Sequence, residues 1–319
     1  MAKTLVLPAK KSPAAPPPSV KRSIVRRRRK AFNGVSFTVP YFLGFAVFVV
    51  APLVIGLAKS LYTTQSSGLG FGGQTVTFSG FDNFARGLRD GQFWGGMWRV
   101  ALFAVVVIPL TQIAGLVAAL LVDEVGRRLA GRFRVALLVP YMIPGIVAIL
   151  IWIYLYSPVV GPLTPFFAML GVHADFYSGS LIWVSIGNIM VWSSLGFNIL
   201  VVYGALQSVP PEIFDSARVD GASRLRIAWS IKVPYVRTSL VLTSVLGIIG
   251  TLQIFSDPML FRSMTPQTVG RNFTPIMMIY DQAFAVGDLN YAAALSIILA
   301  LVVGIISAII YKLTNRAPI

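Results

Sequence analysis

Six uncharged apolar stretches dominate the sequence and limit what the chain can fold into. They cover residues 36–58, 100–122, 135–156, 181–206, 238–256 and 289–311. A helix crosses the hydrocarbon core of a bilayer with about 20 apolar residues, so each stretch is long enough to span it. With 56% hydrophobic and only 12% charged residues, a soluble fold would expose large apolar patches. The sequence therefore predicts an all-α integral membrane protein with six transmembrane helices.

The distribution of Lys and Arg predicts the orientation. An even number of spans places both termini on one side, and that side carries twenty-one of the 27 Lys and Arg residues. Cytoplasmic loops carry the excess of positive charge, so both termini are expected to be cytoplasmic. Residues 1–34 are predicted to be a disordered basic tail, and residues 35–319 the membrane domain. Loops 123–134 and 207–236 are expected on the cytoplasmic side.

The basic tail has two interpretations. Its run RRRRK at 26–30 also occurs in nuclear signals and nucleic-acid patches. Directly before a first membrane span, such a run is better explained as an orientation signal that also meets anionic lipid headgroups. We therefore expect membrane lipids, and no nucleic acid, as its partners.

Several kinds of chemistry are excluded by what the sequence lacks. There is no cysteine, and His173 is the single histidine, so thiolate or His-based metal sites and conventional catalytic triads are excluded. No G-x-x-x-x-G-K-[ST] phosphate loop occurs. The expected spans hold no Asp, Glu or His, which a proton-driven carrier would normally place there. The sequence thus indicates neither a catalytic nor a metal site, and energy for any transport would come from a partner.

A polar segment, PEIFDSARVDGASRLRIAWSIKVP at 211–234, lies between the fourth and fifth stretches. Pro211 suits the first turn of a helix. Glu212 and Asp215 follow near the positive helix N-terminus, where acidic side chains are favoured. Arg218 lies three residues after Asp215, so the two can pair across the helix surface. A short amphipathic helix is therefore expected from Pro211.

A turn and a second short helix are predicted to follow. Gly221 can adopt the left-handed conformation that ends a helix, and Ser223 can cap the next one. Pro234 is expected to interrupt that second helix just before the fifth span. Taken alone, these features fit a helical hairpin lying on lipid as well as a surface that docks a partner.

The segment resembles the signature loop of the permease subunits of binding-protein-dependent ABC importers, E-A-A-x3-G-x9-I-x-L-P. The matching positions are Asp215, Ser216, Ala217, Gly221, Ile231 and Pro234. The departures are Asp for Glu, Ser for the first Ala, and Val233 for Leu. The six spans and the segment FSGFDNFARGLRDGQFWGGMW at 78–98 extend the resemblance to the maltose-type, carbohydrate-uptake branch.

The resemblance implies an architecture and a set of partners. It implies the type I ABC importer permease fold in a bacterial or archaeal cytoplasmic membrane. The partners would be a second homologous permease, two cytoplasmic ATPase subunits and an external solute-binding protein. ATP and Mg would be bound by the ATPase and no cofactor by this chain, which would be a transport subunit and no enzyme. The signature positions, with Glu212, would couple the chain to the ATPase.

A sugar or oligosaccharide is the expected solute. Within the family the alternative is glycerol phosphate or another polyol-like solute. From other classes, the alternatives are a proton-coupled secondary carrier, whose transport would survive ATP depletion, and a non-transporting membrane scaffold.

Polar residues within the spans are candidates for the solute path. Polar groups at this depth tend to face the bundle interior or a water-filled path. The fourth span carries Asn188, Trp192 and Asn198, the fifth carries Gln253, and Asp257 stands directly at the outer end of the fifth. The alternative is that the amides only bridge neighbouring helices and that Trp192 packs against one of them.

Overall fold

The computed structural model describes residues 38–66, 74–125 and 127–315, so the expected basic tail lies outside the described residues. The chain divides into two units, with the boundary after Gly56. The first unit contains helical residues 38–45, the π-helix η1 (Ala46–Val50) and the start of α2 (Ala51–Ser60). Thr38–Ser60 is apolar and long enough to span a bilayer, as the first stretch predicted.

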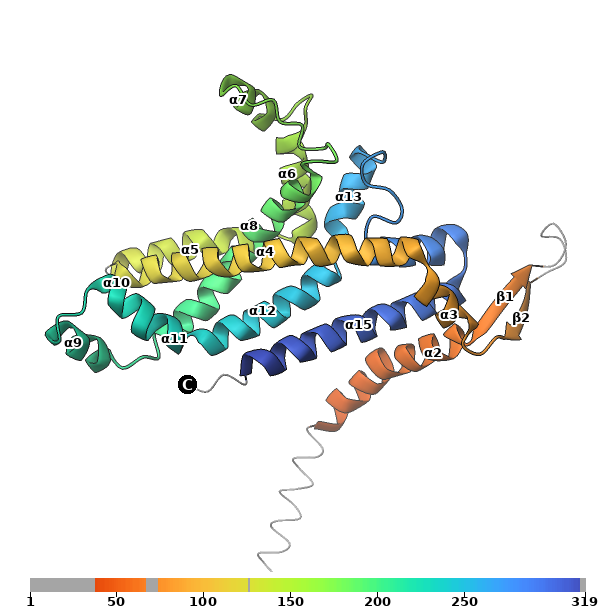
Figure 1. Ribbon diagram of the computed structural model, residues 1–319, viewed down its shortest axis with the longest axis horizontal. Coiled ribbons are helices and arrows are strands. Elements are labelled where there is room, and N and C mark those ends of the chain that lie inside the picture. Colours follow the sequence, from red (N-terminus) through yellow and green to blue (C-terminus); the bar gives the residue numbers. More distant parts are fainter. Residues whose placement is uncertain (1–37, 67–73, 126, 316–319) are drawn as a thin grey trace, which may run out of the picture. The chain divides into compact units, whose positions relative to one another are not determined.

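The second unit begins with the last residues of α2 and continues into a β-hairpin that the sequence did not predict. Strands β1 (Tyr62–Ser66) and β2 (Gln74–Phe78) pair antiparallel, with Tyr62 opposite Phe78. The strands are rich in Thr, a β-branched residue that packs well on a pleated surface. Helix α3 (Asp82–Arg89) follows directly. The hairpin and α3 together form what we call the hairpin end of the unit (Figure 1).

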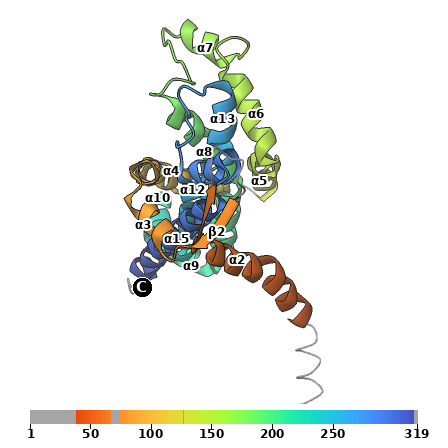
Figure 2. The same ribbon diagram turned by 90° about the vertical axis from the view of Figure 1, so that its right-hand side faces the viewer.

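Long helices make up the body of this unit. Helices α4, α12 and α15 lie lengthwise beside one another, and Figure 2 views them from the hairpin end. The bounds of the long helices are α4 (Gly91–Glu124), α5 (Arg127–Met142), α6 (Gly145–Tyr156), α8 (Ile182–Leu206), α12 (Arg237–Leu252) and α15 (Leu289–Asn315). The shorter elements outside the polar loop are α7 (Leu163–Met169), α13 (Ser256–Met264), α14 (Pro275–Tyr280) and the π-helix η3 (Asp281–Val286).

The third predicted span is not one straight helix. Its residues form α5 and α6, which meet at a bend of 90°. Pro144 sits at the bend in an extended conformation, with φ −53° and ψ 130°. Proline has no amide hydrogen to continue the helical bonding, and it disfavours helical geometry in the residue before it. Counting the bent pair as one span, the described residues provide up to six spans, as predicted.

The predicted boundaries of two spans were too narrow. Helix α4 begins at Gly91, because the Asp90 carboxylate accepts hydrogen bonds from the amides of Gln92 and Phe93. The expected loop 123–134 is largely helical, since α5 already begins at Arg127. A span assigned from hydropathy ends at the first charged residue, whereas the hydrogen bonding of the helix continues through that residue.

Two apolar clusters form the core, and both involve α4 and α8. The larger cluster includes Phe93, Val100, Ile182 and Ile186, toward the hairpin end of these helices. The smaller one lies toward their other end, and its buried members are Ala119, Val122, Ala130, Ile199, Val202, Tyr203, Leu206 and Val236. The middle turns of α4 and α8, which carry several polar residues, lie between the two clusters.

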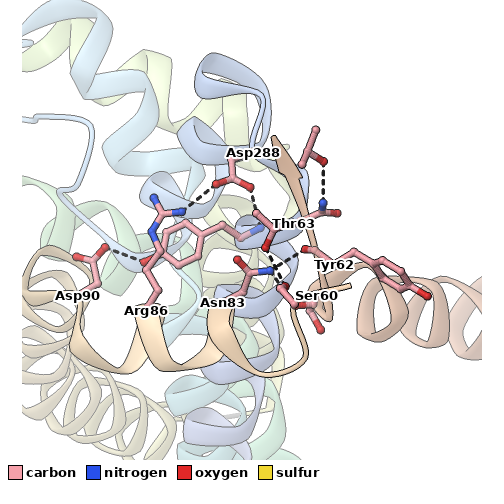
Figure 3. Close-up of polar contacts among 11 residues, drawn as sticks. Ser60, Tyr62, Thr63, Asn83, Arg86, Asp90 and Asp288 are labelled. Carbon is pink, nitrogen blue, oxygen red and sulfur yellow. Dashed lines mark hydrogen bonds and ion pairs between the residues drawn. The ribbon is translucent and has the colours of Figure 1, made fainter. Parts of the chain in front are cut away.

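Side-chain hydrogen bonds join the hairpin to α3. Figure 3 shows Asn83 of α3 pointing at the chain segment that leads into β1. Its amide nitrogen donates to the carbonyl oxygens of Ser60, at 3.0 Å, and Tyr62, at 2.8 Å. Asn83 is buried, so these bonds satisfy an amide that burial would otherwise leave without water. Thr63 and Ser79 add a hydroxyl–hydroxyl bond of 2.8 Å.

A second polar group ties α3 to α15. The Arg86 guanidinium pairs with Asp288 at 3.0 Å and lies 3.7 Å from the centre of the Tyr291 ring (Figure 3). The hydroxyl of this fully buried tyrosine donates to Asp90 at 2.8 Å. The start of α4, helix α3 and the start of α15 are therefore held together at the hairpin end.

Gly115 marks the closest approach of α4 to α8. A Cβ atom placed there would lie 2.7 Å from the Cβ of Asn198. Replacing Gly115 with Ala should force the two helices apart and destabilise the protein by about 1–3 kcal/mol, the usual cost of overpacking. The measurement is the thermal unfolding midpoint of the purified protein in lipid nanodiscs.

Gly204 of α8 provides the matched control. A Cβ atom there has nothing within 4 Å, so Gly204→Ala should leave the midpoint unchanged or raise it slightly, since Ala favours helix over Gly. Equal midpoints for the two variants would contradict the close approach of α4 and α8 at Gly115.

Candidate functional site

The polar loop begins with a short, exposed helix. Helix α9 (Pro211–Val219) starts at a proline, as predicted. Asp215 and Arg218 form the expected ion pair at 2.9 Å, with side-chain exposures of 69% and 66%. An ion pair this exposed contributes little to stability. The carboxylate of Asp215 is therefore accessible to a partner.

Gly221 turns the chain after α9. Its φ is +77°, the left-handed conformation that the sequence predicted. The Ala222 amide donates to the Ala217 carbonyl at 2.9 Å, and the Gly221 amide donates to the Arg218 carbonyl at 3.0 Å. This pairing satisfies carbonyls that the end of a helix would leave free. Ser223 then caps the next helix by accepting from the Arg226 amide.

The second helix of the loop is continuous through three short pieces. They are α10 (Arg224–Ile227), the π-helix η2 (Ala228–Lys232) and α11 (Val233–Tyr235). Pro234 was expected to interrupt this helix, but the prediction was wrong. The proline has no amide hydrogen for the helix, and the i→i+5 bonding of η2 directly precedes it. The chain leaves the helix at Val236, with ψ 2°.

The signature positions differ in their burial. Glu212, Asp215, Ser216, Gly221 and Pro234 are exposed, whereas Ala217 and Ile231 are half-buried. The Ser216 hydroxyl bonds to the Glu212 carbonyl at 2.8 Å. The loop thus exposes the carboxylates of Glu212 and Asp215, and it also exposes large apolar side chains, which are Val219 at 88%, Leu225 at 69% and Trp229 at 66%.

Lys232 lies inside the protein between two carboxylates. Its ammonium is 2.8 Å from Asp123 and 2.5 Å from Glu124, at the end of α4, and its side chain is only 6% exposed. Gln207, which follows α8, donates to the same Asp123 at 2.9 Å. We call these four residues the inner ion cluster. It joins the ends of α4 and α8 to the polar loop.

The inner ion cluster faces α9 across a cavity of about 650 Å³. The Phe214 ring of α9 lies 5.6 Å from the Lys232 ammonium, within the range of a cation–π contact. Burial acts to lower the pKa of Lys232. Its hydrogen bonds to Asp123 and Glu124 and the negative charges of these groups outweigh that effect, so the pKa is raised. Lys232 is therefore charged at neutral pH.

A second cavity lies where the middle turns of α4, α8 and α12 meet, and we call it the mid-helix pocket. Its volume is about 400 Å³. Its polar lining residues are Thr111, Gln112, Tyr141, Ser193, Ser194, Asn198, Thr243 and Thr251. Tyr141 and Phe197, which also line it, stack with ring centres 5.6 Å apart. Every side chain that lines the pocket is uncharged.

Asn198 is the most notable polar residue of this pocket. Its amide nitrogen donates to the Ser194 carbonyl at 3.0 Å, while its side-chain oxygen is buried without a protein partner. A buried acceptor without a hydrogen bond is costly. The oxygen has almost no accessible surface, so water or a solute hydroxyl in the pocket would reach it only after a movement of the side chain or of the helices.

The other expected path residues do not line the mid-helix pocket. Asn188 donates to the Tyr156 hydroxyl at 2.8 Å, and Trp192 packs edge-on against Trp152. Both contacts bridge α8 to α6. Gln253 is exposed at the end of α12, and Asp257 is half-buried in the first turn of α13. The five residues are thus spread over separate places.

Sequence reasoning missed the inner ion cluster and most of the mid-helix pocket. Lys232 stands in the apolar stretch IAWSIKVP, which was a detectable sign of a buried charge that needs a partner. Its partners follow the second span directly, as Asp123 and Glu124, and no local pattern links them to it. Thr111, Gln112 and Thr243 gave only the weak signal of polar residues within apolar spans.

Replacing Lys232 with Met should destabilise the protein by about 2–3 kcal/mol at neutral pH, because two carboxylates would lose their counter-charge. We place the loss at the low end because Glu124 is 38% exposed and solvent screens it. The measurement is the free energy of unfolding in detergent. The matched control is Lys312→Met, which removes an exposed lysine of α15.

The pH dependence of this difference follows from the raised pKa of Lys232. Stability from a raised pKa is fully present below the unfolded value, 10.5 for lysine, and is lost as pH rises through the folded value. The difference in free energy of unfolding between wild type and Lys232→Met should be constant from neutral pH to about pH 10.5 and should become smaller above it. If the difference in stability between wild type and Lys232→Met instead became smaller as the pH was lowered toward neutral, this assignment would be contradicted.

Comparison with known proteins agrees with the geometry. The family model described as "Binding-protein-dependent transport system inner membrane component" matches residues 112–318. The diacetylchitobiose uptake system permease protein NgcF of Streptomyces coelicolor is 29% identical over 321 residues, covering 94% of this chain and 88% of its own. The lactose transport system permease protein LacF of Rhizobium radiobacter is 25% identical over 284 residues, covering 86% and 91%.

A third relative is the sn-glycerol-3-phosphate transport system permease protein UgpA of Yersinia pestis. It is 28% identical over 278 residues, covering 85% of this chain and 90% of its own. Among solved structures, a bacterial ABC transporter involved in the import of the acidic polysaccharide alginate superimposes with a TM-score of 0.79. The sequence identity is 18%, and the match covers 93% of this chain and 100% of that one. This match shows the permease fold that the resemblance implied.

The extent of the family match settles the class of protein. The chain is a multi-pass protein of the inner membrane and a transport subunit, not an enzyme. It works with a solute-binding protein, as the family description states. The alternatives of a proton-coupled carrier and a membrane scaffold are thereby set aside. The chain belongs to the family of binding-protein-dependent transport system inner membrane components, the permease subunits of ABC importers.

Proposed function

We propose that this chain forms one half of the translocation path of an ATP-driven importer for a sugar or oligosaccharide. The observation that carries the proposal is the family match over residues 112–318, together with relatives named for diacetylchitobiose and lactose uptake. The other half of the path would come from a second, homologous permease. An external binding protein would deliver the solute.

The mid-helix pocket supports a neutral, hydroxyl-rich solute. Its uncharged lining offers hydroxyl and amide groups, and Asn198 holds an unpaired acceptor that a helix movement would uncover. Tyr141 and Phe197 add aromatic faces suited to the apolar faces of a sugar ring. In this proposal Asn198 contacts the solute. Asn188 and Trp192 serve mainly to hold α6 against α8, and Gln253 and Asp257 belong to the outer part of the path.

A glycerol-phosphate importer is the second candidate, favoured by the similarity to UgpA. A phosphate group is usually held by Arg or Lys or by backbone amides. No Arg or Lys is among the residues that line the mid-helix pocket. This lining favours the neutral sugar over the anionic solute.

The polar loop is the proposed contact with the ATPase. Two cytoplasmic ATPase subunits would bind ATP and Mg. One of them would bind the polar loop of this chain, and the other would bind the equivalent loop of the second permease. The carboxylates of Glu212 and Asp215 are exposed on α9 and could meet basic groups of the ATPase. The exposed apolar side chains Val219, Leu225 and Trp229 suit an ATPase groove and a lipid surface equally. A helix lying on lipid would in addition extend a lysine to the headgroups. Lys232 points inward to the end of α4.

Purification from the native membrane tests this function directly. The protein should co-purify with an ATPase and a second permease, and the preparation should hydrolyse ATP. Addition of the importer's binding protein loaded with lactose or diacetylchitobiose, the two sugars tried, should raise hydrolysis. Recovery of the chain alone, from membranes that release other ABC importers intact, would overturn the proposal.

Charge reversal by Asp215→Lys should reduce the recovered ATPase subunit at least about tenfold, because a loss of about 1.4 kcal/mol in docking changes binding by that factor. Folding should be unaffected, since the Asp215–Arg218 pair is exposed. The measurement is the ATPase-to-permease ratio after purification. Arg132→Glu, a charge reversal at an exposed residue of α5, should leave the ratio at the wild-type value.

A further inference from the structure

We propose that the inner ion cluster fixes the polar loop to α4, so that α9 and the inner half of α4 move as one rigid body. Lys232 is then a positioning residue that passes displacement of the loop to the wall of the mid-helix pocket. This inference rests on the proposed function for its biological meaning, but the rigid connection itself can be measured in the isolated chain.

The first support is that the cluster joins three separate segments. Lys232 comes from the loop, Asp123 and Glu124 from the end of α4, and Gln207 from the end of α8. Lys232 and Glu124 are 108 residues apart in the sequence. Covalent continuity connects the loop to α8 and α12, and the inner ion cluster supplies its polar connection to α4, beside the apolar packing of Val236 with Ala119 and Val122.

The second support is that α9 itself reaches the cluster. Phe214 projects from α9 toward Lys232, and the centre of its ring lies 5.6 Å from the Lys232 ammonium. Arg224, at the start of α10, lies 4.0 Å from Glu124. The Arg224 side chain is 87% exposed, so Phe214 makes the main contact of α9 with the cluster. Figure 1 shows α10 beside the end of α4.

The third support is that α4 connects the inner ion cluster to the mid-helix pocket. Gln112 lies eleven residues before Asp123, which is about 17 Å along a helix that rises 1.5 Å per residue. Its side-chain oxygen accepts a hydrogen bond from the Thr243 hydroxyl of α12 at 2.9 Å. Both residues line the mid-helix pocket. A helix is stiff over this length, so a shift at Asp123 would reach the pocket.

The burial of the charges distinguishes this arrangement from an incidental surface contact. Lys232 is 6% exposed and Asp123 is 14% exposed, so their attraction is weakly screened. Exposed pairs such as Asp215–Arg218 hold long side chains loosely and contribute little. A buried lysine held by two carboxylates and a cation–π contact has few alternative positions.

Pulsed electron spin resonance can measure the rigid connection. The chain contains no cysteine, so V219C on α9 and L121C on α4 would be its two thiols for spin labels. Both positions are exposed, at 88% and 64%. In nanodiscs, the wild-type background should give one narrow distance distribution. Lys232→Met should broaden it, and Lys232→Arg, which can reach both carboxylates, should restore it.

Two further variants guard against simple unfolding. Glu124→Gln removes one charge from the more exposed partner and should broaden the distribution partly while the protein stays folded. Lys312→Met removes an exposed lysine outside the cluster and should leave it narrow. A wild-type-like distribution in folded Lys232→Met would overturn the proposal.

The assembled importer provides the second arm. With ATP and vanadate trapping the closed ATPase, the wild-type distance between the labels should stay unchanged, because loop and α4 move together. A shifted distance on trapping would mean that the loop moves independently and would also overturn the inference. Failure of the chain to assemble with an ATPase would contradict the proposed function alone, since the nanodisc measurement needs no partner.

Discussion

The contact between α4 and α8 organises the second unit. Gly115 allows α4 to approach the backbone of α8 at Asn198, and the two apolar clusters hold the helices together on either side of this crossing. In a bilayer, apolar side chains gain little by leaving lipid, so close packing through small residues carries much of the association. The mid-helix pocket lies beside this crossing, and Asn198 belongs to both.

The sequence predicted the number and approximate position of the spans because bilayer thickness imposes a length that composition reveals. It also predicted the left-handed turn at Gly221 and the cap at Ser223, which depend on single residues and their neighbours. The bend at Pro144 was missed because a proline can be accommodated in a membrane helix, and local sequence does not say whether it is. The pairing of Lys232 with Asp123 could not be predicted, since it depends on how distant helix ends come together.

The two ends of the unit are built differently. At the hairpin end, Asn83 and Arg86 take part in a network that joins α3, the hairpin and α15. At the opposite end, the polar loop is held mainly by Lys232 and its two carboxylates, and α9 itself is largely exposed. An importer subunit needs one end that keeps its shape and another that responds to a partner. The distribution of buried polar contacts agrees with that need.

The long sequence separation within the inner ion cluster also affects how the protein is made. Glu124 leaves the ribosome 108 residues before Lys232, an interval on the order of 10 s at typical rates of synthesis. During that interval the acidic end of α4 has no lysine partner and must stay in contact with water. The cluster can therefore form only after Lys232 has been synthesised, which makes it a late step of assembly.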